Sequence, residues 1–263
     1  MQGVVAPNPG PFTLEGTNTW IVGAGPTLVI DPGPDDRGHL DAIRERAGHI
    51  GAILLTHHHP DHAPGTVALG RKAGAPVMAA SPRPGERPLQ DGMTVEADDV
   101  VLQVVAAPGH TPDHVVFFER DRAALFTGDA VLGRGTSVID PPEGDLAAYE
   151  RSLHRMVELR PEVIFPGHGP IVRPALAKLV EYLEHREERE RQVLRVLRDG
   201  PHRPEEIVPA IYVEYPEALH AAAARSVLAH LIKLERAGVV ARVAPSSDRF
   251  ELTDRGSRND APT

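Results

Sequence analysis

The chain has 263 residues with 28 basic and 37 acidic side chains, so its formal net charge at pH 7 is −9. This length suits one large domain or one domain with a small appendage, and 41% hydrophobic residues exclude a disordered chain. Cysteine is absent, which excludes disulfides, thiolate nucleophiles and thiolate metal sites. The start has no signal-peptide pattern and no apolar run reaches about 18 residues, which predicts a cytoplasmic protein without a membrane span.

Short runs rich in β-branched residues predict strands through the first two-thirds of the chain. These runs are residues 19–22, 26–30, 51–56, 76–80, 100–105, 115–119, 123–127 and 162–165. Helical patterns lie between them at 38–47, 65–73 and 145–159, the last with Asp145 in position to cap it. Strands mixed with helices over such a length predict stacked α/β layers.

The composition changes near Arg173, where a long charged helix is predicted at 176–198 and ends at Asp199-Gly200-Pro201. Further helices are predicted at 204–210, 216–220 and 221–237, followed by strands at 239–243 and 249–252. Helices followed by a short hairpin are the outline of a winged helix. We therefore predict two domains: residues 1–173 carry 14 basic and 22 acidic side chains, and residues 174–263 carry 14 and 15.

One segment holds most of the residues that indicate chemistry, and it reads Thr56-His57-His58-His59-Pro60-Asp61-His62. Residues two apart on an extended backbone point to the same side, so His57 and His59 can converge on one ion. Asp61 and His62 follow where the chain turns toward a helix, and they can reach a second ion beside the first. The same alternation predicts that His58 points away and supports the ligands by hydrogen bonding or packing.

Further ligand candidates follow glycines at the ends of other apolar strands, and these are His110, Asp129 and His168. Glycine allows close approach of the backbone at a sheet edge, where a pocket can form. Imidazole and carboxylate ligands without thiolate select zinc, iron or manganese. Seven ligands exceed the four of a structural zinc site, which favours two ions over one. The alternative of turn, capping or core histidines suits an isolated histidine better than this set.

The order and spacing of these ligands resemble those of the metallo-β-lactamase superfamily. The resemblance implies an αββα sandwich with the metal site along one edge of the two sheets. It also implies a ligand set for two Zn²⁺ ions: His57, His59 and His110 for one, Asp61, His62 and His168 for the other, and Asp129 bridging both. Residues 1–173 are then the catalytic domain, and 174–263 are a linker helix with a small winged-helix-like domain.

Motifs near both ends of the chain resemble, more narrowly, the β-lactamase-like protein 2 group. They lie at residues 8–23, 128–138, 182–186 and 211–235. The resemblance to this group implies an endoribonuclease acting on single-stranded RNA, as in an animal member. It equally implies hydrolysis of thioesters, because relatives of the group include fungal enzymes that cleave polyketides from carrier proteins.

The ligand set predicts a zinc-dependent hydrolase in which two cations supply a metal-bridged hydroxide as the nucleophile. Asp61 is expected to orient that hydroxide or to carry a proton to the leaving group. The resemblance over the full length favours RNA as the substrate. The acidic charge instead favours a thioester or ester of the acyl-CoA, acyl-carrier or glutathione type.

Two other functional classes are alternatives to a hydrolase. A winged-helix regulator that binds nucleic acid requires a basic recognition face, and helix 221–237 offers only Arg225, Lys233 and Arg236. A redox enzyme with one iron, such as a persulfide dioxygenase, shares the fold, so the count and identity of the metal separate it from a hydrolase.

Several residues near the ligands have supporting roles in this interpretation. Arg134 and Thr136 lie in a glycine-rich loop after the bridging aspartate and are predicted to contact substrate, with a solvated surface charge as the alternative for Arg134. Asn18 is predicted either to tie down a loop near the site or to serve in a turn. Asp113 and His114 are predicted to hydrogen-bond the ligands rather than to bind metal.

Overall fold

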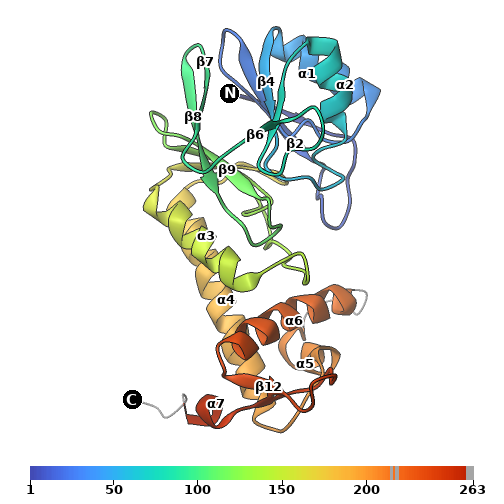
Figure 1. The fold of residues 1–263 in the computed structure, drawn as a ribbon, viewed down its shortest axis with the longest axis vertical. Helices are drawn as coiled ribbons and strands as arrows, with labels where there is room; N and C mark the ends of the chain where they lie inside the picture. The colour runs from blue at the N-terminus through green and yellow to red at the C-terminus, as the bar shows by residue number, and fades with distance from the viewer. Residues whose placement is uncertain (214–215, 217–218, 259–263) are drawn as a thin grey trace.

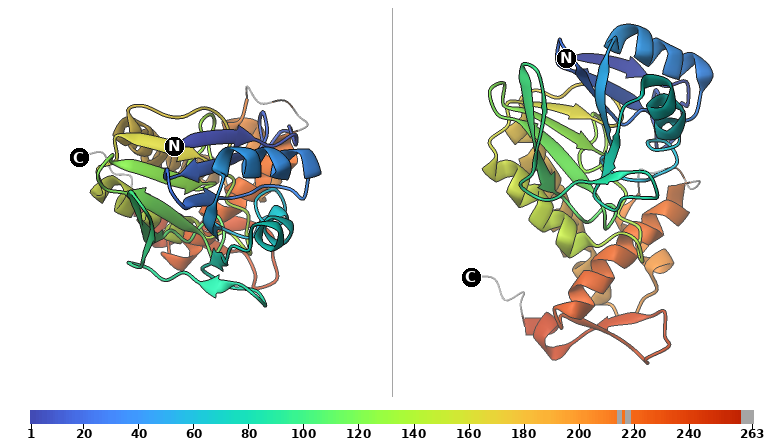
Figure 2. Two further views of the ribbon diagram at one scale, coloured as in Figure 1. Left: turned by 90° about the horizontal axis from the view of Figure 1, so that it is seen from above. Right: turned by 45° about the horizontal axis from the view of Figure 1, so that its top comes forward.

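The computed structural model describes residues 1–213, 216 and 219–258, and it contains two face-to-face sheets above a smaller helical unit (Figures 1 and 2). The first sheet has the order β1 (Gln2–Val5), β2 (Asn18–Val22), β3 (Thr27–Ile30), β4 (Ile50–Leu54), β5 (Val77–Ala79) and β6 (Arg87–Pro88). The second sheet has the order β11 (Val163–Pro166), β10 (Ala124–Gly128), β9 (Val115–Glu119), β8 (Val100–Ala106) and β7 (Thr94–Ala97).

Helices cover the outer face of each sheet. Helices α1 (Arg37–Ala47) and α2 (Gly65–Ala73) share a hydrophobic core with the first sheet. Helix α3 (Leu146–Glu158) and the first half of α4 (Ala175–Leu197) do the same for the second sheet. These four layers are the αββα sandwich that the resemblance implied.

The alternation of side chains along β9 shows why the layers stack. Val115 and Phe117 point between the sheets and pack in one core with Trp20. Val116 and Phe118 point to the opposite face and pack in the core with α3 and α4. Because both faces are buried, each such side chain contributes about 1.5–3 kcal/mol of hydrophobic stabilisation.

The predicted strands and helices of the first part are present, with bounds shifted by at most about two residues. Asp145 caps α3 as predicted, since its side chain accepts a 2.8 Å hydrogen bond from the Ala148 amide. Strands β1, β6 and β7 were missed because they are short and carry few buried apolar residues.

The C-terminal unit contains α5 (Pro204–Ile211), α6 (His220–Arg236), β12 (Val240–Arg242), β13 (Phe250–Leu252) and α7 (Asp254–Arg258). Helix α7 was not predicted, and the helix predicted at 216–220 falls partly on residues outside those described. The second half of α4 belongs to the core of this unit, where Val193 and Leu197 pack with Val227. Helix α4 therefore contributes to the cores of both parts, and the domain boundary at residue 173 stays a prediction.

The length of α4 makes it a candidate for a membrane-spanning helix. It spans 23 residues, but charged side chains recur along it. In the part of the chain that the structure describes, no helix is long and apolar enough to cross a bilayer. The cytoplasmic location stays a prediction.

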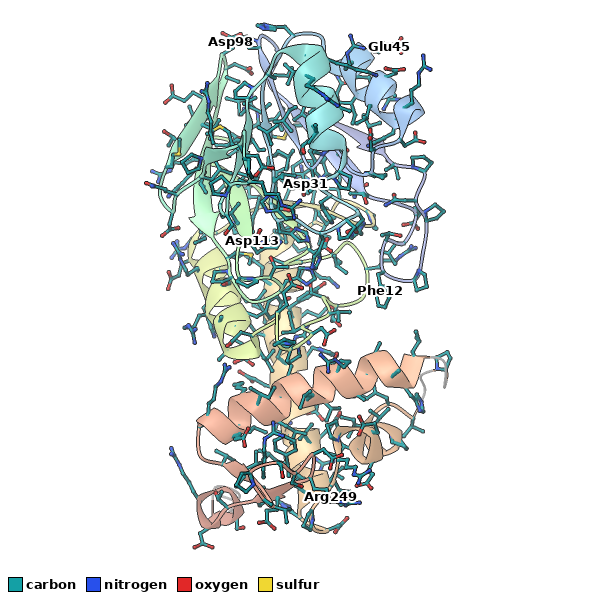
Figure 3. All side chains as sticks on the ribbon, turned by 45° about the vertical axis from the view of Figure 1, so that its right-hand side comes forward. Phe12, Asp31, Glu45, Asp98, Asp113 and Arg249 are labelled. Atoms are coloured by element: carbon teal, nitrogen blue, oxygen red, sulfur yellow. The ribbon has the colours of Figure 1, made fainter. Side chains whose placement is uncertain are left out.

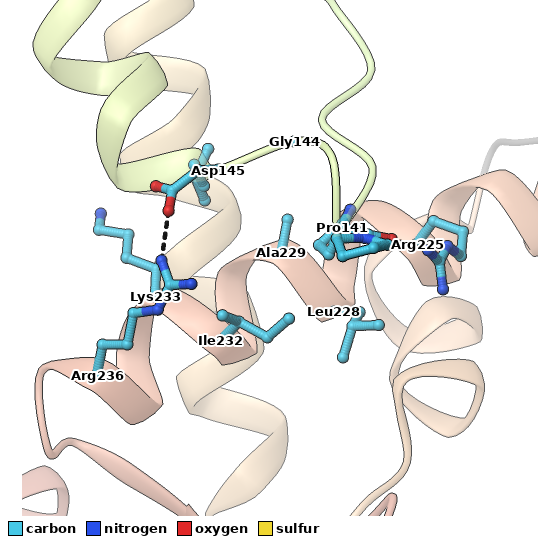
Figure 4. A pocket seen from close by; sticks show the side chains of 11 residues that line it. Pro141, Gly144, Asp145, Arg225, Leu228, Ala229, Ile232, Lys233 and Arg236 are labelled. Atoms are coloured by element: carbon cyan, nitrogen blue, oxygen red, sulfur yellow. Dashed lines mark hydrogen bonds and ion pairs between the residues drawn. The ribbon is translucent and has the colours of Figure 1, made fainter. Parts of the chain in front are cut away.

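Ion pairs join α6 to α3, α4 and the loop before α3, beside a cavity of about 340 Å³ that several of these residues line (Figure 4). The pairs are Arg225 with Asp140, Lys233 with Glu150 and Glu190, and Arg236 with Asp145. Both Lys233 contacts measure 2.7 Å, and they join α6 to α3 and α4 at once. The basic residues of α6 are thus engaged within the molecule.

Replacement of Lys233 by methionine is expected to destabilise the protein by about 2 kcal/mol near neutral pH, because Glu150 and Glu190 are left together without a cation. Burial works to raise the pKa of Glu190, but the neighbouring His230 and Lys233 side chains outweigh it and lower that pKa. A lowered carboxyl pKa means that this stabilisation is present above the usual glutamate range and is lost as pH falls. The deficit of the variant should therefore shrink in acid. Urea unfolding at several pH values measures it.

Lys72→Met is the matched control, since the Lys72 ion pair with Asp41 is exposed on both sides. It should change the free energy of unfolding by less than about 0.5 kcal/mol. An equal loss in the two variants would contradict the structural role given to Lys233.

Candidate metal centre

The predicted ligands come from loops that follow four strands at one edge of the sandwich. His57, His59, Asp61 and His62 follow β4, His110 follows β8, Asp129 follows β10 and His168 follows β11. Ligand atoms of His57, His59, His110 and Asp129 all lie within 4.8 Å of one another, and the same holds for Asp61, His62, Asp129 and His168. The structure thus brings all seven residues together in two groups that share Asp129.

The spacing of the facing nitrogens suits metal coordination. His62 Nε2 lies 3.2 Å from His168 Nε2, and His110 Nε2 lies 3.1 Å from His59 Nδ1. Nitrogens bound tetrahedrally at about 2.0–2.1 Å from a zinc ion are about 3.3 Å apart. The nitrogens within each group are therefore close to the separation that one cation requires.

Outward-facing atoms of the rings have partners of their own, which orients the inward-facing atoms. His57 Nδ1 lies 3.0 Å from Thr56 Oγ1, and His110 Nδ1 lies 2.8 Å from the Val138 carbonyl oxygen. On the inward side, His57 Nε2 and Asp129 Oδ1 are buried and have no hydrogen-bond partner among the described residues. Each such unsatisfied atom costs about 1–3 kcal/mol, and a bound cation removes that cost. The residues therefore fit divalent metal ions.

The ionisable side chains of the cluster shift one another's pKa values. Burial alone would raise the pKa of Asp129, but His62 and His168 outweigh it and hold that pKa well below its usual range. Burial works to lower the pKa of His168, but the carboxylates of Asp129 and Asp61, at 3.2 and 3.0 Å from its Nε2, outweigh it and raise that pKa to about 9. Burial lowers the pKa of His57 well below its ordinary value, which keeps that ring neutral. Without metal, the site thus holds protons that a cation must displace.

Asp31, whose role was not predicted from the sequence, supports this cluster from the position directly after β3 (Figure 3). Its carboxylate accepts hydrogen bonds from the Thr56 amide at 2.8 Å and the Thr56 hydroxyl at 2.7 Å, and it lies 3.0 Å from His62 Nδ1. Asp31 is buried and has φ 51°, a left-handed conformation that is uncommon for a residue other than glycine. The available signal was its position directly after an apolar strand, the context of the predicted ligands.

Asp31→Asn is expected to weaken metal binding about 10–100-fold, because a neutral amide orients and polarises His62 less well than a carboxylate. Asparagine tolerates the left-handed backbone, so the fold should be kept. Competition with a chromogenic chelator measures the affinity. Asp113→Asn, which alters a carboxylate that contacts no predicted ligand, is the control, and an equal loss in both variants would remove the specific role of Asp31.

The two histidines predicted to support the ligands differ in what they contact, and only His114 contacts a predicted ligand among the described residues. His58 points away from the cluster, and its ring nitrogens lie 2.8 Å from Asp113 and 3.0 Å from Glu86. His114 Nε2 accepts a 3.3 Å hydrogen bond from the Asp129 amide. Burial lowers the pKa of His114 to about 3, which leaves this nitrogen free to accept. Asp113 thus reaches His58 rather than a predicted ligand.

Asn18 ties down the turn that carries His168. Its Nδ2 donates to the carbonyl oxygens of Pro166 and Gly169 at 3.1 and 2.8 Å, as the prediction of a tied loop expected. Gly167 allows this turn to lie close to the cluster, because a Cβ atom at position 167 would lie 2.7 Å from Asp129 Oδ1. Only glycine fits this position beside the site.

A cavity of about 530 Å³ extends from the cluster to the C-terminal unit. His59, Asp61, His110 and Asp129 line one end of it, and Leu219, Ala222, Ala223 and Ser226 line the other. Arg134 and Thr136 also line it, although Arg134 forms an ion pair with Glu15. Their contact with substrate stays a prediction. Phe12, an exposed apolar side chain, lines the cavity on the side that faces the start of α6 (Figure 3).

This sandwich, with a histidine–aspartate cluster at its edge, defines the class of protein. A model of the metallo-beta-lactamase superfamily matches residues 12–82 and 72–168, and a model of the beta-lactamase associated winged helix domain matches residues 204–248. The crystal structure of a metallo-beta-lactamase family protein from Thermus thermophilus superposes with a TM-score of 0.81, at 24% identity, over 96% of this chain and 98% of that one. The chain belongs to the metallo-beta-lactamase superfamily and carries a C-terminal winged helix.

Relatives with higher sequence identity indicate a smaller group within the superfamily. The chain is 34% identical to the beta-lactamase-like protein 2 homologs of Caenorhabditis elegans and Drosophila melanogaster, over 90% and 92% of its length and 84% and 89% of theirs. It is 36% identical to an atrochrysone carboxyl ACP thioesterase of Paecilomyces divaricatus, over 68% of this chain and 59% of that protein. The resemblance stated from the sequence is thereby confirmed.

A further similar structure bears on the metal. A protein crystallised in a di-iron-bound form is 31% identical, with a TM-score of 0.57, over 67% of this chain and 96% of that one. The histidine and aspartate clusters indicate divalent metal cofactors for this chain, and they suit iron as well as zinc. The chain is thus a metal-dependent hydrolase of its superfamily.

Proposed function

We propose that the chain is a two-zinc hydrolase of a small acyl thioester or ester. The observation that carries this proposal is the cavity between the cluster and α6. Its walls combine the ligand residues at one end with apolar side chains such as Phe12, Leu14 and Leu219. Such a cavity suits an acyl group whose carbonyl carbon lies at the cluster.

Two divalent cations, when bound, acidify a water molecule and stabilise negative charge that develops on the substrate oxygen. His57, His59 and His110 would hold one, Asp61, His62 and His168 the other, and Asp129 both. Asp61 lines the cavity, and its Oδ2 lies 3.0 Å from His168 Nε2. These contacts support a role for this carboxylate in orienting the attacking water and then carrying a proton to the leaving sulfur or oxygen.

The charges around the cavity favour an acyl substrate over RNA. Binding a polyanion requires cations that are free to contact phosphates. Of the arginines at or beside the cavity, Arg134 is engaged by Glu15 and Arg225 by Asp140. Arg186 also lines the cavity, but it is buried, and one buried cation does not form a surface for a polyanion. The exposed Glu143, 3.6 Å from His59, adds negative charge at the site.

Endoribonuclease activity on single-stranded RNA is the second candidate. It is supported by the similarity to the beta-lactamase-like protein 2 homologs, which extends through the winged helix. A winged-helix regulator that binds nucleic acid is less well supported, because the basic residues of α6 form ion pairs within the molecule.

A direct comparison of substrates tests the proposal. Zinc-loaded protein should hydrolyse thioesters of N-acetylcysteamine, assayed by the released thiol, and should leave single-stranded RNA intact. The Asp129→Ala variant, prepared identically, controls for contaminating enzymes. Cleavage of RNA by the unaltered chain but not by this variant, with thioesters intact, would replace the acyl proposal by the nuclease.

A further inference from the structure

Arg186 of α4 is a buried cation that the proposed chemistry does not use. This residue is 3% exposed and lines the cavity beside the cluster. One guanidinium nitrogen, Nη2, donates to the Ser137 carbonyl oxygen at 2.6 Å, and the group lies 5.1 Å from the centre of the Tyr149 ring. Its Nε is buried and has no hydrogen-bond partner among the described residues.

No carboxylate in the described part of the chain forms an ion pair with Arg186. The acidic residues near the cavity have other partners: Glu15 pairs with Arg134, Asp140 pairs with Arg225, and Glu143 lies 3.6 Å from His59. Asp61 and Asp129 belong to the histidine–aspartate cluster. A buried cation without an anion is costly, and one carbonyl and one aromatic ring offset only part of that cost. This imbalance favours an anionic ligand in the cavity.

The neighbouring His185 points to the same ligand chemistry. It also lines the cavity, and its Nδ1 is buried without a hydrogen-bond partner among the described residues. Burial and the charge of Arg186 lower the pKa of His185 to about 4, so at neutral pH this ring is a neutral hydrogen-bonding group. Arg186 supplies the charge, and His185 supplies a second polar contact next to it.

We propose that Arg186 and His185 form a subsite for a carboxylate at the far end of the acyl group. This inference rests on the proposed function, and it names the substrate class as a thioester or ester of a dicarboxylic acid. The guanidinium fork matches a planar carboxylate better than any other cationic side chain does. The substrate would then span the cavity, with its reactive carbonyl at the Asp129 cluster and its carboxylate at α4.

A matched pair of substrates tests the subsite in the zinc-loaded protein. Succinyl and butyryl thioesters of N-acetylcysteamine have acyl chains of equal length, but only the first ends in a carboxylate. The unaltered chain should favour the succinyl thioester in kcat/KM by about tenfold or more, the effect of one charged hydrogen-bonded contact. Equal values for the two substrates in the unaltered chain would overturn the proposal.

Variants separate binding from a purely structural role. Arg186→Gln should remove the preference for the succinyl thioester while the butyryl value changes less than about threefold, and His185→Ala should reduce the preference with less risk to the fold. Arg191→Gln, which removes an exposed charge from the same helix, should leave the preference unchanged. An equal fall for both substrates in Arg186→Gln would show that Arg186 only holds the Ser137 loop.

A binding measurement distinguishes failure of the subsite from failure of the proposed function. Glutarate should raise the thermal midpoint of the zinc-loaded chain more than that of Arg186→Gln, and neutral glutaramide should affect neither. If thioesters are not cleaved but this difference appears, the proposed reaction is wrong and the carboxylate subsite is kept. If glutarate raises both midpoints equally, the subsite is wrong even where thioesters are cleaved.

Discussion

Asp129→Ala is expected to lower turnover by more than about a thousandfold, because one substitution alters both predicted metal positions. The carboxylate belongs to both ligand groups, and its Oδ1 lies 3.3 Å from His62 Nε2 and 3.2 Å from His168 Nε2. Atomic emission should show two metal ions per unaltered chain and one or fewer in the variant.

Circular dichroism and the thermal midpoint establish that the Asp129 variant is folded. Asp113→Ala is the matched control, since Asp113 contacts His58 and lies outside both groups. It should retain most of the activity and both ions. Unchanged turnover in folded Asp129→Ala would contradict the ligand assignment.

Removal of metal by a chelator is expected to abolish activity and to lower the thermal midpoint by about 10 °C. Ligand present at a thousand times its Kd stabilises a protein by about 4 kcal/mol, and each kcal/mol shifts the midpoint of a chain of this size by about 2–4 °C. The physical reason is that buried atoms such as His57 Nε2 and Asp129 Oδ1 lose their expected partner. Differential scanning calorimetry with and without chelator measures the shift.

Zinc, iron and manganese, added back separately, identify which metal restores activity and stability. The affinity should rise with pH between 7 and 9. The nearby carboxylates of Asp129 and Asp61 raise the pKa of His168 to about 9 against the effect of burial, so below that pH a proton competes with the cation. An affinity that is independent of pH would show that His168 is not a ligand.

Local sequence was sufficient for much of the site. The alternation of His57 and His59 after a strand, and the glycines before His110, Asp129 and His168, report backbone geometry that extends over only a few residues. The structure places these residues together at one edge. The residue pattern of the strands likewise predicted the layers, because a strand that is buried on both faces is a nearly continuous run of apolar residues.

Other features depend on contacts between distant segments. Asp31 of the β3 end meets His62, and Arg186 of α4 meets the Ser137 loop, through packing that no local pattern encodes. The same is true of Lys233, whose charge on α6 is neutralised by α3 and α4 rather than left for a nucleic acid. The sequence by itself therefore determined the layers and the metal-binding residue types. Only the tertiary structure decided which charges are paired, since pairing depends on distance and burial across the whole fold.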